Sequence, residues 1–366
     1  MLRAGIVGLP NIGKTTLFNA VTAQTSGVTA NYAFSTSKPN VGVVTVPDER
    51  LAPLAKIVKT SVIVPATVEF VDIAGLVRGS SKGEGMGNQF LASIRETDTM
   101  IHVVRCFEDE NIVHVDDTVD ARRDIETIQI ELALADLATV ERRRERVQKG
   151  VKGGEKNAKA ELEVLDKLHP ALEEFLPAKS VSLTEEERAI ARNFFLLTMK
   201  PTIYAANVME ATLAAPEDNE QVRAIREVAA SEGAECLVIC AQLEADLVGL
   251  APEERREYLE SLGVKSSGVD QLIQSAYRVL GLMSFLTAGE KEARAWTIPQ
   301  GSRAQDAAGA IHSDIARGFI RAEIVSYDAL LRAGSYAAAK EQGLTRLEGK
   351  DYIMQEGDVV NFRFNV

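Results

Sequence analysis

The sequence predicts an α/β fold: a mostly parallel sheet covered by helices, interrupted by an inserted helical hairpin and followed by a small α+β domain. Three observations carry this prediction. Before Gly281, short apolar runs alternate with helical stretches, which is typical of a parallel sheet covered on both faces. Two long helical patterns interrupt that alternation between Phe107 and Pro201. After Gly281, strand-like runs flank a single helical stretch.

The strands of the main sheet are expected at five apolar runs, residues 3–9, 67–75, 100–107, 202–208 and 236–241. Ligands of such sheets bind beyond the C-terminal ends of the strands, so polar residues that follow these runs are candidate site residues. We expect this α/β domain to comprise residues 1–117 and 200–281.

The helical patterns that interrupt the alternation of strands and helices predict a helical hairpin at residues 118–199. Apolar residues at spacings of three and four indicate a first helix, and a repeat of leucines indicates a second one that Pro177 ends. The Gly153-Gly154 pair between them suits a helix stop. Because a short loop makes consecutive helices antiparallel, we expect a hairpin inserted into the α/β domain.

The C-terminal part, residues 282–366, predicts a separate α+β domain. Strands are expected at residues 293–298 and 320–327, with a helix at 304–317 between them. The stretch 352–366 has the pattern of a β-hairpin with a glycine turn.

A phosphate-binding loop follows the first strand. The stretch "GLPNIGKT", residues 8–15, matches the G-x-x-x-x-G-K-[ST] pattern of P-loop nucleoside triphosphatases, and it lies between a strand and a helix as that motif requires. Gly8 and Gly13 allow a tight turn whose backbone N–H groups face phosphate oxygens, and the helix dipole adds positive potential. Lys14 is expected to reach the β- and γ-phosphates, and the Thr15 hydroxyl to bind Mg²⁺.

Such a site also needs an acid near the metal, a backbone N–H near the γ-phosphate and a second hydroxyl ligand. Asp72 ends the next strongly apolar strand, where an acid fixes the metal shell. Gly75 lies three residues later, where its backbone N–H can approach the γ-phosphate. A second hydroxyl is expected from a loop that responds to triphosphate, and the spacing does not choose among Ser35, Thr36 and Ser37.

The base-binding residues are expected after the strand at 202–208. Asn207 ends it, and Glu210 follows three positions later, with Val208 where a lysine accompanies the asparagine in guanine-specific sites. A short aspartate accepts hydrogen bonds from guanine N1–H and N2–H, whereas adenine N1 repels a carboxylate. The longer Glu210 cannot keep that geometry without moving the base. The sequence therefore argues against a strong guanine preference and permits adenine, with Phe107 as a candidate to pack on the base.

Several stretches together resemble the Obg-like ATPases of the YchF type, which are ribosome-binding P-loop proteins of the translation-factor class. They are "GLPNIGKTTLFNA", "NYAFSTSKPNVGVV", "DIAGLVRGSSKGEGMGNQFL", "FEDENIVHV" and "ANVMEA". The stretches "RAWTIPQGSRAQDAAGAIHSD" and "RLEGKDYIMQEGDVVNFRFNV" resemble the C-terminal TGS domain of that family, a ubiquitin-like β-grasp module. The resemblance implies a G-type P-loop NTPase domain, an inserted coiled coil, preference for ATP over GTP, dependence on Mg²⁺ and association with ribosomes.

The resemblance also implies site residues. It assigns nucleotide binding to Asn11, Ile12, Gly13, Lys14, Thr15, Thr16, Asn207, Met209 and Glu210. It assigns metal binding to Thr15 and Thr36, and so selects one of the three hydroxyls. The chain departs from the family pattern at Ala33, Ser35 and Lys38, all beside Thr36, which bears on how that loop closes rather than on the identity of the site.

The water-orienting residue of related switches, a glutamine soon after the D-x-x-G motif, is replaced here by Leu76. Hydrolysis is therefore expected to be slow, or another group must reach the water. His114 is the candidate catalytic residue, since a neutral imidazole can accept a proton from water. The alternative is an ordinary surface histidine.

Function is therefore predicted as an ATP-binding, slowly hydrolysing switch that associates with ribosomes and regulates translation or a stress response. The alternatives are a GTPase of the same fold and a binding scaffold that nucleotide stabilises. RNA contact is expected, if at all, through the helical insert or the TGS domain. The basic stretch "RRRER" at 142–146 is a candidate for it, although we favour a solvated helix face.

Composition limits the other classes. The chain has 366 residues and a formal charge of −12, which argues against a broad electrostatic grip on nucleic acid. Its three cysteines, Cys106, Cys236 and Cys240, form no C-x-x-C pair and are interpreted as reduced thiols. No apolar run is long enough to cross a bilayer. We expect a cytoplasmic protein with no membrane contact that acts as a monomer.

Overall fold

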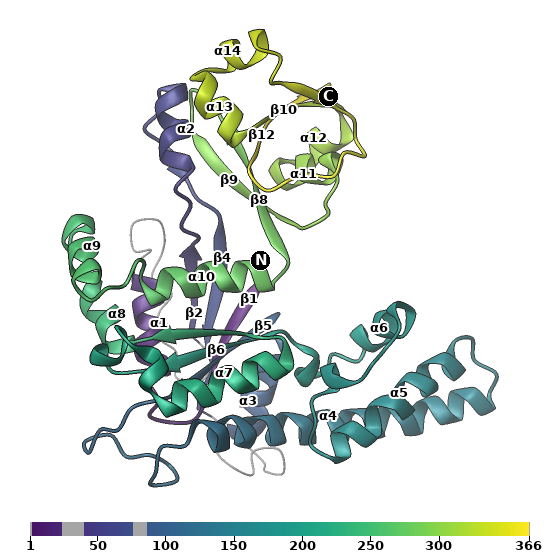
Figure 1. Cartoon of the computed structure of the whole chain (residues 1–366). Coiled ribbons are helices and arrows are strands. Elements are labelled where there is room, and N and C mark those ends of the chain that lie inside the picture. Colours follow the sequence, from purple (N-terminus) through teal and green to yellow (C-terminus); the bar gives the residue numbers. More distant parts are fainter. Residues whose placement is uncertain (1, 24–39, 76–85, 366) are drawn as a thin grey trace. The chain divides into compact units, whose positions relative to one another are not determined.

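The computed structural model describes residues 2–23, 40–75 and 86–365 (Figure 1). The chain forms two compact units. The first comprises Met1–Val43 and Glu69–Leu272, and the second comprises Val44–Val68 and Ile273–Val366. The division into three domains that we drew from the sequence stays a prediction.

The first unit is built on a six-stranded sheet in the order β2-β4-β1-β5-β6-β7. Its strands are β1 (Arg3–Val7), β2 (Asn40–Thr45), β4 (Thr67–Asp72), β5 (Thr99–Arg105), β6 (Thr202–Asn207) and β7 (Glu235–Ile239). The pairs β1–β4, β1–β5, β5–β6 and β6–β7 are all parallel. The predicted, largely parallel α/β sheet is confirmed, and the C-terminal ends of β1, β4 and β6 carry the predicted site residues.

The central strands β5 and β6 are buried along their whole length, which requires cover on both faces of the sheet. Figure 1 shows helices on both sides. On one face Val104 and Tyr204 pack against Ile125 of α4 and Ile225 of α7. The helices of this unit are α1 (Lys14–Ala23), α3 (Met86–Arg95), α4 (Ala121–Lys152), α5 (Ala158–Glu173), α6 (Glu185–Arg192), α7 (Glu220–Glu232), α8 (Ala241–Leu247), α9 (Pro252–Ser261) and α10 (Gly268–Val279), the last of which extends into the second unit.

The predicted helical hairpin is formed by α4 and α5, which project together in Figure 1. Asp120 caps the start of α4 by accepting a hydrogen bond from the backbone N–H of Arg123, and α4 ends at the expected Gly153. The hairpin has its own core, which includes Val140, Leu165 and Leu168.

A buried carboxylate joins α4 to the chain that returns to the sheet. Asp136, which is 1% exposed, accepts hydrogen bonds from the backbone N–H groups of Leu197 and Thr198, both at 2.8 Å. It also accepts one from the Thr198 hydroxyl at 2.7 Å. These contacts hold the 3₁₀ turn η2 (Leu197–Met199), which leads directly into β6.

The second unit is α+β, as predicted, with a mixed sheet in the order β11-β10-β12-β8-β9-β3. Its strands are β3 (Ile63–Val64), β8 (Leu282–Ala288), β9 (Ala293–Pro299), β10 (Phe319–Ser326), β11 (Arg346–Glu348) and β12 (Asp358–Phe364). Its helices are α2 (Leu51–Val58), α11 (Ala304–Ile311), α12 (Ser313–Arg317), α13 (Tyr327–Ala333) and α14 (Tyr336–Glu341). Side chains of β8, β10 and β12 pack against α11 around Phe285.

The expected hairpin at 352–366 is wrong. Gly357 does turn the chain, with φ +77°, but β12 pairs antiparallel with β10 and parallel with β8. Ile353, before the turn, forms only an isolated bridge with Arg303. The Glu356 carboxylate accepts the backbone N–H of Ser284 at 2.8 Å, so the turn is joined to β8 rather than folded on itself. Among the described residues, no helix is both long and apolar enough to span a membrane.

Candidate nucleotide-binding site

The phosphate loop connects β1 to α1 at the C-terminal edge of the first sheet. Gly13 has φ +92°, and a Cβ there would lie 2.5 Å from Nδ2 of Asn207. Gly8 has φ +154°, and a Cβ there would lie 2.6 Å from the carbonyl oxygen of Val103. Both positions therefore require glycine, because a side chain would meet both backbone strain and a direct clash.

The Lys14 side chain turns back toward the start of this loop. Its side chain is buried, and Nζ donates a hydrogen bond to the carbonyl oxygen of Leu9 at 2.6 Å. Burial lowers the pKa of Lys14 to about 8, and the nearby Asp72 carboxylate opposes that shift. An anion bound in the loop would offset the desolvation of the ammonium group, as expected of a group placed to receive phosphate.

The Thr15 hydroxyl and the Asp72 carboxylate meet at the same edge, with 3.2 Å between Oγ1 and Oδ2. Burial raises the pKa of Asp72, while the Thr15 hydrogen bond and the Lys14 charge lower it. The backbone of Gly75 lies close by, since a Cβ there would be 3.1 Å from Nζ of Lys14. Hydroxyl and carboxylate oxygens are the hard donors that Mg²⁺ prefers, so this pair fits the predicted metal. Thr36, the other predicted ligand, lies outside the described residues.

Asn207 links the end of β6 to the phosphate loop. Its Nδ2 donates a hydrogen bond to the carbonyl oxygen of Ile12 at 2.8 Å, and its Oδ1 accepts one from the backbone N–H of Ala241 at 3.0 Å. The side chain is 4% exposed. One N–H and one lone pair of the amide remain for a base, so this residue joins the predicted phosphate and base residues into one site.

Met209 and Glu210 lie at the rim. Met209 is 49% exposed and, with Phe107, lines a pocket of about 360 Å³. Glu210 is half-buried, and its Oε1 accepts a hydrogen bond from the Tyr258 hydroxyl at 2.9 Å. That bond raises the pKa of Tyr258, so the hydroxyl stays protonated as the donor. Tyr258 was missed from the sequence because it lies on α9, far along the chain and outside any motif.

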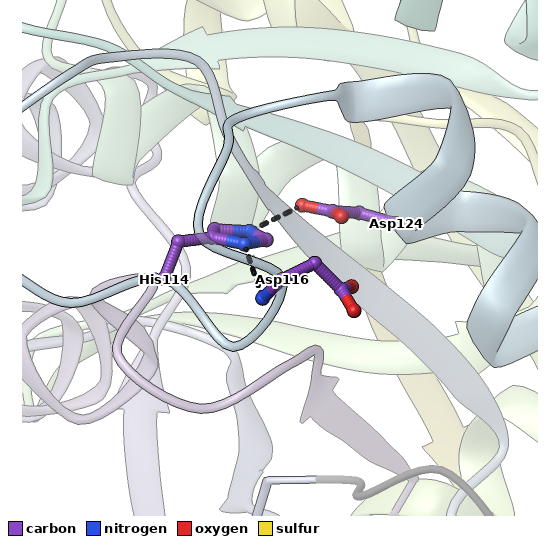
Figure 2. A group of neighbouring side chains, drawn as sticks. All are labelled: His114, Asp116 and Asp124. Atoms are coloured by element: carbon purple, nitrogen blue, oxygen red, sulfur yellow. Dashed lines mark hydrogen bonds and ion pairs between the residues drawn. The ribbon is translucent and has the colours of Figure 1, made fainter.

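His114 lies in the segment between β5 and α4 and is 5% exposed. Figure 2 shows its ring facing Asp116 and Asp124, with a dashed line to each. Nδ1 accepts a hydrogen bond from the backbone N–H of Asp116 at 3.1 Å, so Nε2 carries the proton that faces the Asp124 carboxylate at 2.9 Å. The alternative of a surface histidine is therefore excluded. Both ring nitrogens are engaged in this arrangement, and a catalytic role stays a prediction.

The His114 segment touches the phosphate loop. Nδ2 of Asn11 donates a hydrogen bond to the carbonyl oxygen of Val113 at 3.3 Å. The cluster of His114, Asp116 and Asp124 also has the spacing of a metal-binding group. The Arg123 guanidinium, however, lies 3.4 Å from the Asp124 carboxylate and 3.6 Å from the Asp116 carboxylate. It therefore supplies a positive charge where a cation would bind. We interpret the group as a hydrogen-bonded support for the histidine.

Comparison with known proteins gives matches along both units. Residues 3–144 match a family model described as "50S ribosome-binding GTPase". Residues 282–365 match one described as "Protein of unknown function (DUF933)", which carries the label YchF-GTPase_C.

Relatives named "Ribosome-binding ATPase YchF" match the whole chain. The Bacillus subtilis (strain 168) protein is 54% identical over 365 residues, covering 100% of both chains. The Escherichia coli O157:H7 protein is 52% identical over 365 residues, covering 100% of this chain and 99% of its own. A solved structure, the Schizosaccharomyces pombe YchF GTPase, has a TM-score of 0.86 and 34% identity, covering 99% of this chain and 97% of that one. The phosphate loop, the Thr15–Asp72 pair and these full-length similarities agree, and the chain belongs to the YchF family of P-loop nucleoside triphosphatases.

Proposed function

We propose that this protein is an ATP-binding molecular switch that hydrolyses ATP slowly, associates with ribosomes and regulates translation or a stress response. The base-binding strand end carries the proposal. Asn207 is in place beside the phosphate loop, but the residues after it are Val208, Met209 and Glu210 rather than those of a guanine-specific site.

The names of the relatives disagree about the nucleotide, since the bacterial proteins are called ATPases and the yeast structure a GTPase. The rim favours adenine. The Glu210 carboxylate is engaged by Tyr258. The exposed Met209 and the half-buried Phe107 line one pocket and offer apolar surface for a base of either kind. Without a free carboxylate to accept from N1–H and N2–H, guanine loses its main advantage.

Mg²⁺ is the cofactor that we propose, with the hydroxyls of Thr15 and Thr36 as ligands and Asp72 behind Thr15. The 3.2 Å contact between Thr15 and Asp72 supports the first ligand. When bound, the ion would neutralise charge on the β- and γ-phosphates. Lys14 would hold the same phosphates, and Asn11, Ile12, Gly13 and Thr16 would contribute backbone or side-chain contacts around them.

The test is a paired titration of the purified protein with ATP and GTP in Mg²⁺, by competition against a fluorescent analogue. We expect ATP to bind at least about tenfold more tightly, a difference of about 1.4 kcal/mol. Tighter binding of GTP would contradict the proposal and support the GTPase alternative. Turnover at saturating ATP then distinguishes the switch from a scaffold that nucleotide only stabilises.

His114 is proposed as the group that orients the attacking water. Its segment rests on the phosphate loop through the Asn11–Val113 contact, which supports the proposal. Its ring, however, faces Asp124, so Nε2 must leave that carboxylate before it can approach a water at the γ-phosphate. Slow turnover is the expected consequence of holding the ring in this way.

A His114→Ala variant should lower the turnover number about 100-fold or more, in the range for removal of a general acid–base group, while ATP affinity changes little. Single-turnover hydrolysis and ATP titration on the same sample separate the two effects. His169→Ala, on the hairpin helix α5, is the matched control. Unchanged turnover in His114→Ala would remove this residue from the mechanism.

Ribosome association is proposed from the names of the relatives. RNA contact is proposed through the helical hairpin or the C-terminal unit, which we assign to the TGS type. Within the basic stretch, Arg143 and Arg144 are paired with Glu161 and Asp166 of α5, which favours a solvated helix face there. We also propose that the protein acts as a monomer and that it is located in the cytoplasm.

A further inference from the structure

The Glu210–Tyr258 hydrogen bond lies beside the residues proposed to hold the base. Glu210 begins the 3₁₀ turn η3 (Glu210–Thr212), three residues after Asn207. Tyr258 comes from α9, and its hydroxyl donates to Oε1 of Glu210 at 2.9 Å. The two residues are 48 positions apart, so the contact is tertiary and not a feature of local chain geometry.

The packing of α9 places Tyr258 close to the turn that carries Glu210. Leu259, the neighbour of Tyr258, is buried with Leu243 and Leu247 of α8. The same cluster includes Leu213, which directly follows η3. The helix that carries the tyrosine and the turn that carries the glutamate are therefore held by one apolar cluster. The Tyr258 side chain is itself 40% exposed, so the cluster positions its helix and the hydrogen bond positions its hydroxyl.

The chemistry of the two purines gives this contact a consequence. A carboxylate that reads guanine must direct both oxygens at the base, one toward N1–H and one toward the N2 amino group. The tyrosine hydroxyl directs Oε1 of Glu210 toward α9 instead. A glutamate can sample other rotamers. Its length alone therefore does not stop Glu210 from turning toward a base that shifts to accommodate the longer side chain.

We propose that Tyr258 is a specificity-determining positioning residue, which holds Glu210 turned away from the base and so prevents this carboxylate from binding guanine. The inference rests on the proposed preference for ATP and gives it a further cause besides the missing lysine and the longer acidic side chain. Tyr258 itself needs no contact with nucleotide for this role.

The experiment compares ATP and GTP affinities of the full chain and of Tyr258→Phe, which removes only the hydroxyl. GTP affinity should rise about three- to tenfold, as expected when one hydrogen bond to a charged group no longer restrains it. ATP affinity should stay within about twofold, because adenine gains nothing from a freed carboxylate. In the double variant Tyr258→Phe with Glu210→Ala, the gain for GTP should disappear.

Glu257→Gln is the matched control, since it alters an exposed neighbour on the same helix and should leave both affinities unchanged. If the unaltered protein prefers ATP and Tyr258→Phe keeps the same ATP-to-GTP ratio, the inference is overturned and the proposed function stands. Equal weakening of both nucleotides in Tyr258→Phe would also overturn it, because that result indicates a structural role. A preference of the unaltered protein for GTP would overturn the proposed function itself.

Discussion

Replacing Lys14 by alanine should reduce triphosphate affinity by about 100-fold or more, or about 2.8 kcal/mol at 1.4 kcal/mol per tenfold change. The Nζ atom lies inside the phosphate loop, bonded to the carbonyl oxygen of Leu9 and attracted by Asp72. Lys14 is the buried cation at the start of α1, so its removal takes a positive charge out of the loop itself. Calorimetric titration with ATP and Mg²⁺ measures the loss.

Folding provides the internal check on that result. Burial disfavours the charged form of Lys14, which is why its pKa lies near 8 instead of 10.5. The ammonium group therefore costs stability in the nucleotide-free protein at neutral pH, and that cost falls as pH rises through 8. Lys14→Ala should unfold no more readily than the unaltered protein without nucleotide. Lys159→Ala, on the exposed face of α5, should change neither property. Retained ATP binding in Lys14→Ala would contradict the assigned phosphate site.

Replacing Asp136 by alanine should lower the free energy of unfolding of the first unit by roughly 3–5 kcal/mol. The carboxylate accepts three hydrogen bonds, from two backbone N–H groups and the Thr198 hydroxyl. Its removal leaves buried donors without an acceptor, which costs more than the net value of the bonds themselves. Urea denaturation followed by circular dichroism measures the effect.

The control for this change is Asp166→Ala, which removes an aspartate whose side chain is 46% exposed and paired with Arg144. An exposed ion pair of that kind contributes little to stability. If both variants unfold at the same urea concentration as the unaltered protein, Asp136 does not anchor the hairpin. Because η2 leads directly into β6, loss of the anchor should also weaken ATP binding at Asn207.

The sequence could bring the predicted phosphate-site residues together because each follows a recognisable element. Gly8, Gly13 and Lys14 belong to one loop, and parallel strands bring their C-terminal ends to one edge, so Asp72 and Asn207 could be placed without knowing any packing. The inserted hairpin was equally accessible, because its helices carry a long apolar repeat and a glycine pair at the turn.

The tertiary contacts of the site could not be predicted from the sequence. Nothing in the stretch around His114 shows that Asp124 of α4 covers its ring, and nothing in α9 shows that Tyr258 meets Glu210. The C-terminal hairpin failed for a related reason. Gly357 predicted the turn, but which strands pair across a turn is decided by the rest of the sheet, here β10 and β8.

The second unit is not continuous in sequence, since Val44–Val68 fold with Ile273–Val366. The early segment supplies β3, which pairs with β9, and Arg50, which forms an ion pair with Glu356 at 2.7 Å. A gene fragment that begins near codon 273 would therefore encode an incomplete unit, which lacks the edge strand β3 and Arg50. The second unit cannot be transferred between proteins as one continuous segment. Transfer of this C-terminal fold to another protein during evolution would have to include Val44–Val68 or replace the contacts that this segment makes with β9 and Glu356.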